Sequence, residues 1–110
     1  MASETVVYDF GEIHDDWITC IAVSPNSKTF FTGSKDSTMR FWSVSMRECL
    51  KDFGLIHQGS LSAMIMTSDG YMLYTADNKG YLKMWDINDH TEYDFGKVHE
   101  NAITCLAITP

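Results

Sequence analysis

The sequence predicts an all-β fold built from repeated four-stranded units, and three observations support this prediction. Three histidines, His14, His57 and His99, recur 43 and then 42 residues apart. In the first two units a tryptophan, Trp42 or Trp85, follows the histidine by 28 residues. Short β-branched and aromatic runs alternate with polar turns, and no segment shows a sustained helical period. A repeat of about 40–45 residues is typical of the blades of a β-propeller.

Each expected strand of the first unit is a short β-prone run between polar turns. A run at residues 5–10, rich in β-branched and aromatic residues, precedes this unit as a separate strand. Residues 18–23 are nearly all apolar without alternation, which is typical of a strand buried on both faces. The polar run 33–37 fits a tight turn. The four strands of this unit are therefore predicted at residues 18–23, 29–32, 38–43 and 48–53.

The second unit repeats this plan, and a third unit begins. Its strands are predicted at residues 61–66, 71–75, 81–86 and 91–95, with one further strand at 103–109. We divide the chain into an outer strand of an incomplete blade at 5–10, repeat 1 at 11–53, repeat 2 at 54–95 and the start of repeat 3 at 96–110. Such a partial propeller is expected to leave open edges and apolar faces. We therefore expect it to need further blades or association to cover them.

The triplet Asp-Phe-Gly occurs three times, at residues 9–11, 52–54 and 94–96. A protein kinase uses this triplet to hold Mg²⁺, but it also needs a Gly-rich phosphate loop and a His-Arg-Asp motif. The sequence contains neither, and the triplet recurs at the blade period. We interpret it as the end of a strand followed by a turn glycine, and we predict no cofactor.

The details of both repeats resemble the WD-repeat β-propeller family over about residues 5–110. The first repeat contains His14, the run Ile-Thr-Cys-Ile-Ala-Val-Ser-Pro at 18–25, and the run Phe-Thr-Gly-Ser-Lys-Asp-Ser-Thr-Met-Arg-Phe-Trp at 31–42. The second repeat contains Leu-Lys-Met-Trp-Asp at 82–86. Two departures occur. Ser43 replaces the Asp after the first Trp, and the usual Gly before each His is replaced by Ile13, Ile56 and Val98.

The resemblance implies a hydrogen-bonded network of His, Ser or Thr, Asp and Trp within each blade. Buried polar side chains need such partners, and these groups can form a chain of donors and acceptors. In the first blade the matching residues are His14, Thr32, Asp36 and Trp42. In the second blade they are His57, Thr75 and Trp85, with Lys79 at the position of the acid. The first blade is therefore expected to be the better determined, and the third repeat offers only His99.

The same residue types suggest two chemical alternatives to a structural network. Three histidines suggest a metal site, but one per blade points each to its own network rather than to a shared ion. His14, Asp36 and Thr32 resemble a nucleophilic triad by residue type. No oxyanion hole or strained elbow can be read near them, so we predict neither a metal nor a catalytic residue.

Three cysteines are present, and none lies in a CxxC pair. Cys20 and Cys105 each follow a repeat histidine by six residues, and Ala63 occupies the equivalent place in the second repeat. A position that accepts Cys or Ala is expected to be small and buried. Together with Cys49 these residues fit a reducing compartment. We expect a cytoplasmic location, and a nuclear one stays open.

The loops before the inner strands line one mouth of the ring in propellers of this type. An exposed Trp17 there would be an interface anchor, whereas a packed one would contact a neighbouring blade, and both readings stay open. Charges in the same loops would make an acidic rim for a partner or a solvated edge. The possible partner-binding residues are Asp15, Asp16, Trp17, Lys35 and Glu100.

Composition excludes several classes of partner. The chain has 110 residues, is 45% hydrophobic and carries a formal net charge of −7. This charge argues against nucleic acid and anionic membranes, because both are bound largely through Lys and Arg. No apolar run is long enough to span a bilayer, and the N-terminus does not resemble a signal peptide.

The resemblance implies a non-catalytic scaffold or adaptor that binds proteins or peptides. Two alternatives stay open. The chain could be the regulatory or substrate-binding propeller portion of an enzyme or enzyme complex, or a truncated product with no independent role.

Overall fold

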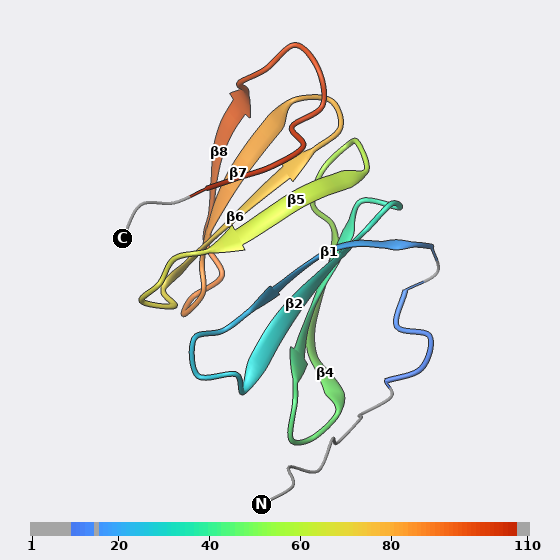
Figure 1. Cartoon of the computed structure of the whole chain (residues 1–110), viewed down its shortest axis with the longest axis vertical. Coiled ribbons are helices and arrows are strands. Elements are labelled where there is room, and N and C mark those ends of the chain that lie inside the picture. The colour runs from blue at the N-terminus through green and yellow to red at the C-terminus, as the bar shows by residue number, and fades with distance from the viewer. Residues whose placement is uncertain (1–9, 15, 108–110) are drawn as a thin grey trace, which may run out of the picture.

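The computed structural model describes residues 10–14 and 16–107 and shows two four-stranded antiparallel sheets (Figure 1). The first has the order β1-β2-β3-β4 and the second β5-β6-β7-β8. The strands are β1 (Ile18–Val23), β2 (Thr29–Ser34), β3 (Thr38–Ser43), β4 (Glu48–Leu55), β5 (Leu61–Met66), β6 (Met72–Asp77), β7 (Tyr81–Asp86) and β8 (Glu92–Lys97). The predicted all-β fold with two full blades is confirmed. Within the described ranges, no helix is long and apolar enough to cross a membrane.

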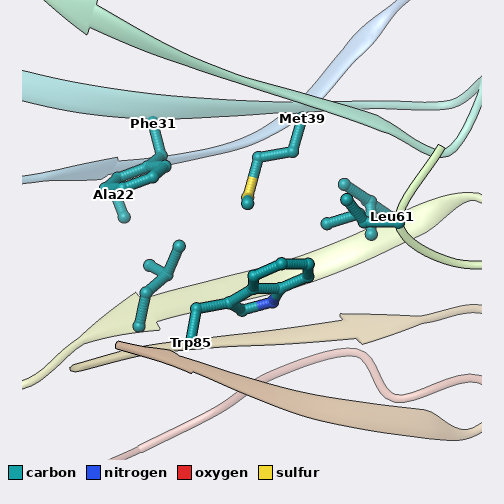
Figure 2. Packing of buried hydrophobic residues seen from close by; sticks show 7 residues of the cluster. Ala22, Phe31, Met39, Leu61 and Trp85 are labelled. Carbon is teal, nitrogen blue, oxygen red and sulfur yellow. The ribbon is translucent and has the colours of Figure 1, made fainter. Parts of the chain in front are cut away.

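The two sheets pack face to face around one apolar cluster (Figure 1). Figure 2 shows Phe31 and Met39 of the first sheet directed at Leu61 and Trp85 of the second. The sheets lie close together at Gly33, where a Cβ atom would lie only 2.7 Å from Leu61 Cδ1. A side chain at this position would therefore require the Leu61 side chain to shift, since real Cβ atoms do not approach so closely.

The Asp-Phe-Gly triplet is a bulge inside the fourth strand, which corrects the prediction that its glycine ends the strand. Gly54 and Gly96 have φ angles of 67° and 74°, and β4 and β8 continue past them. The register shifts there by one residue, so Phe53 and Phe95 are the extra residues. Glycine adopts this left-handed conformation without strain, and a bulge re-aims the side chain beside it.

The phenylalanine of the bulge packs against the tryptophan of the following unit. The ring centroids of Phe53 and Trp85 lie 5.5 Å apart at an interplanar angle of 75°. Phe10 contacts Trp42 in the same way, at 6.1 Å and 73°. Edge-to-face pairs of this kind are favourable for aromatic rings. Phe10 and Phe53 of the first two triplets therefore each pack against the blade that follows.

The two flanking strands have different outcomes. The strand at 5–10 stays a prediction, because residues 5–9 lie outside the described residues and only Phe10, which is not in a strand, is described. Residues 103–107 form no strand, and 108–110 lie outside the described part. Ile103 instead donates its N–H to the Asp77 carbonyl at 3.2 Å and packs against Ala63 and Ala76. The Ile103 carbonyl accepts from the Ser62 hydroxyl. The backbone groups of Ile103 thus bond to a strand end and to a side chain, and residues 103–107 form no ladder.

Two smaller predictions also change. Cys20 is half-buried against the core, but Cys49 and Cys105 are exposed, so Cys105 does not occupy a buried site in the described chain. His90 follows the polar pair Asn88-Asp89 in the sequence, and a histidine in such a turn is expected to be solvated. Its ring instead lies 5.1 Å from that of Phe53, at the joint between the sheets.

Candidate functional site

The second blade contains a continuous buried chain of hydrogen bonds. His57 Nδ1 lies 2.9 Å from Asp77 Oδ2, and His57 Nε2 lies 2.9 Å from Thr75 Oγ1. The indole N–H of Trp85 donates to Thr75 Oγ1 at 2.9 Å. With the carboxylate as acceptor, Nδ1 of His57 donates and Nε2 accepts from the Thr75 hydroxyl. Every polar atom of the network thus has a partner, as burial requires.

Asp77 also holds the turn between β6 and β7. Its Oδ1 accepts the backbone N–H groups of Lys79 and Tyr81 at 2.9 and 3.0 Å. Burial lowers the pKa of His57 below its usual value, and the Asp77 carboxylate opposes this effect only in part. The imidazole is therefore neutral at pH 7 and acts as a donor and an acceptor rather than as a charge.

The first blade has the same histidine, threonine and tryptophan contacts but a different acid. His14 Nε2 lies 2.6 Å from Thr32 Oγ1, which accepts from Trp42 Nε1 at 2.9 Å. His14 Nδ1 meets the hydroxyl of Thr38 at 3.1 Å, and that hydroxyl donates to Asp36. Asp36 therefore reaches the histidine only through a threonine.

Asp36 lies in a more open environment than Asp77. Its side chain is partly exposed, whereas Asp77 has no exposed surface. Burial acts to raise the pKa of Asp36, but hydrogen bonds from the side chain and backbone of Thr38 outweigh it and lower the pKa. The acid of the first blade is thus a turn residue that water can reach.

The position predicted for the acid of the second blade was wrong. Lys79 is exposed, and Asp77 contacts His57 in its place. The expected order of the two blades is therefore reversed, since the direct histidine–acid contact in the described part of the chain is that of His57 with Asp77. One signal in the sequence could have found Asp77. It follows Thr75 by two residues in a strand, and such residues point to the same face.

Both networks are shielded from solvent at their threonines. Thr32 and Thr75 have no exposed surface. In the described part of the chain, no group of three or more His, Cys, Asp or Glu side chains could hold a metal ion. His99 makes no contact with a threonine of its own repeat in this part. What the networks do is fix the connections before β1 and β5 onto their own sheets.

The predicted partner-binding residues gather only in part. Trp17 is 72% exposed, and Lys35 Nζ lies 4.7 Å from the centroid of its indole ring. Asp16 Oδ1 accepts the backbone N–H of Trp17 at 2.8 Å. We call Asp16, Trp17 and Lys35 the loop surface. Glu100 is exposed elsewhere, 3.7 Å from Lys97, and Asp15 lies outside the described residues.

Stacked four-stranded sheets with equivalent networks define a segment of a β-propeller, and comparison with known proteins gives the family. The profile of the WD domain, G-beta repeat, matches residues 6–43. The solved WD40 repeats of RRP9 superpose with a TM-score of 0.77 at 26% identity, over 83% of this chain and 29% of theirs. The chain belongs to the WD-repeat β-propeller family.

Curated relatives are much longer than this chain. The nuclear distribution protein PAC1 of Candida tropicalis is 31% identical over 101 residues, which cover 87% of this chain and 19% of PAC1. The kinesin-like protein KIF21B of Mus musculus is 24% identical over 99 residues, which cover 90% of this chain and 6% of KIF21B. The chain thus spans less than a fifth of either relative.

Proposed function

We propose that the chain is a non-catalytic scaffold that binds protein or peptide partners through the loop surface. WD40 repeats generally mediate protein–protein interactions. The observation that supports this role most directly is the exposure of Trp17, at 72%. Tryptophan is enriched among the residues that dominate interface energies, because it buries a large rigid area.

The surroundings of Trp17 favour a partner with mixed polar and apolar chemistry. Lys35 lies over the indole ring, where a cation interacts favourably with the π-system. The Asp16 carboxylate holds the backbone of Trp17 and thereby fixes the start of its side chain. A preordered aromatic anchor costs less entropy on binding than a mobile one. The buried threonines of both networks support a structural role in preference to a catalytic one.

The experiment compares capture of proteins by the native chain with capture by two variants. Trp17→Ala should remove the specific partners. Tyr71→Ala is the matched control, because Tyr71 is 68% exposed. It lies in the turn after β5, whereas Trp17 lies in the loop before the equivalent strand β1. Partners retained by Trp17→Ala, or lost equally in both variants, would contradict the proposal.

We also propose that the partners are proteins with basic segments and that the chain works in the cytoplasm or nucleus. The net charge of −7 supports the first point, since it favours cationic partners over nucleic acid. The three free cysteines support the second. Imaging of a tagged full-length protein tests the location, and a secreted product would contradict it.

A further inference from the structure

Arg40 of the first blade occupies a site made by two other segments. Its Nε lies 3.3 Å from Asp52 Oδ2 on the neighbouring strand β4. Its Nη1 donates to the carbonyl of Ile13, in the connection that carries His14. The planar guanidinium thus joins an outer strand to the loop before β1. A fork of fixed N–H donors is suited to such paired acceptors.

The second blade repeats the walls of this site but not the arginine. Asp94 lies opposite Lys83 in the register of β7 and β8, just as Asp52 lies opposite Arg40 in the register of β3 and β4. Ile56 precedes His57 as Ile13 precedes His14. The side chain between these walls is therefore a lysine in place of an arginine.

Lys83 does not occupy the equivalent site. Its Nζ lies 3.2 Å from Glu92 Oε2. Glu92 occupies the strand position that Cys49 occupies in the first blade. The Oδ1 atom of Asp94 accepts the N–H of Gly96 at 2.7 Å, as Asp52 accepts that of Gly54. The other oxygen of Asp52 pairs with Arg40, whereas Asp94 has no ion pair within the described residues.

A cavity of about 540 Å³ lies at this place. Its volume falls in the range of small-molecule sites, and its wall combines apolar and acidic groups. Glu92 already neutralises the one lysine there, which leaves three carboxylates in the lining, those of Asp36, Asp77 and Asp94. The residues that line it include Asp36, Ile56, His57, Tyr81, Lys83 and Asp94.

We propose that this cavity binds an arginine side chain of a partner protein, in the position that Arg40 fills in the first blade. The inference rests on the proposed scaffold function and adds the chemistry of one partner residue. A guanidinium can reach Asp94 and the Ile56 carbonyl together, as Arg40 reaches Asp52 and Ile13. An ammonium group is a point charge and cannot span both acceptors with paired donors.

The test uses N-acetyl-L-argininamide as the probe and N-acetyl-L-lysinamide as its control. NMR spectra of the isotope-labelled full-length protein, rather than of residues 1–110 alone, are recorded during titration at constant salt. The arginine probe should shift the amide signals of Ile56, His57 and Asp94, with an affinity about fivefold higher than that of the lysine probe. Equal effects of both probes, or shifts confined to other residues, would overturn the proposal.

Two conservative variants sharpen the test. Lys83→Arg supplies the guanidinium from within the chain, so binding of the probe should fall about tenfold or more. Arg40→Lys should open the equivalent place in the first blade and add new shifts at Ile13 and Asp52. A Lys83→Arg variant that keeps its dispersed spectrum and still binds the probe would refute the inference.

The two proposals can fail separately. If the probe binds but no partner is captured in a way that depends on Trp17, the arginine site stands and the scaffold role is overturned. Capture that depends on Trp17 and is unchanged by Lys83→Arg, with no probe binding, would do the reverse.

Discussion

In the second blade Asp77 touches the ring of His57, whereas in the first blade Asp36 reaches His14 only through the hydroxyl of Thr38. The position of Asp77 in β6 corresponds to that of Ser34 in β2, which is also fully buried. The acid has therefore moved from a turn into a strand between one repeat and the next. The comparison shows that the histidine needs an acceptor at Nδ1, and that either a carboxylate or a hydroxyl can supply it.

The largest expected effect concerns the faces that the two blades turn away from each other. Ile21 and Val23 of β1 are each 55% exposed, and Phe95 of β8 is 52% exposed. Bare apolar faces promote association, so residues 1–110 alone should be marginally stable or should aggregate. Light scattering and thermal melts test this, with and without added repeats. A monodisperse monomer that melts cooperatively above about 60 °C would contradict it.

The second prediction compares the two acids. Asp77→Ala leaves His57 Nδ1 and the N–H groups of Lys79 and Tyr81 without their acceptor, so the free energy of unfolding should fall by about 3–5 kcal/mol. Asp36→Ala should cost about 1 kcal/mol, because water can replace a partly exposed carboxylate. Urea melts measure both values. Equal losses would show that the direct contact carries no extra weight.

A third comparison concerns the same apolar position in successive repeats. Leu61 packs in the joint between the sheets, and Ile103 packs on Ala63 and Ala76 one repeat later. Leu61→Ala should lower the free energy of unfolding by about 2–5 kcal/mol. Ile103→Val, which removes one methylene group, should cost about 1 kcal/mol or less. Urea melts of the two variants test this order, and a larger loss for Ile103→Val would reverse it.

The smallest expected effect is a pH dependence from the second blade. Burial lowers the pKa of His57, so the unfolded chain binds a proton more readily than the folded chain. Stability should then be complete above about pH 6.5 and should fall as the pH drops below it, by at most about 1.4 kcal/mol per unit for this one group. Burial also lowers the pKa of His90, which adds an effect of the same sign.

Variants separate the two histidines. His90→Gln should retain most of the pH dependence, and His57→Gln should reduce it at a cost in overall stability. Urea melts between pH 7 and pH 5 make the comparison. A steeper loss in His57→Gln than in the native chain would contradict the assignment.

Much of the fold could be predicted because it follows from spacing. The recurrence of His14, His57 and His99, with Trp42 and Trp85 at a fixed distance, gave the blades and their number of strands. Those spacings depend on the number of residues in each strand and turn, which is a local property.

The remaining features depend on conformation or on neighbours. Gly54 in a bulge and Gly70 in a turn are the same residue type with similar positive φ angles, and only the pairing with a neighbouring strand separates them. The acid of the second blade was counted from Trp85 along the chain, whereas the strand face selects Asp77. Ile103 was expected in a strand, but a strand requires a partner, which its own sequence does not specify. The cavity near Asp94 forms because the Lys83 ammonium group pairs with Glu92 and not with Asp94.

The contact of Phe53 with Trp85 means that each period of the sequence completes the packing of the period after it. The unit that is copied along the chain and the unit that packs in space are therefore offset. A gene rearrangement that adds or removes one whole period, wherever it is cut, preserves this pairing of a phenylalanine with the tryptophan of the following period. A cut of any other length separates one such pair, so growth of the array by duplication is restricted to whole periods.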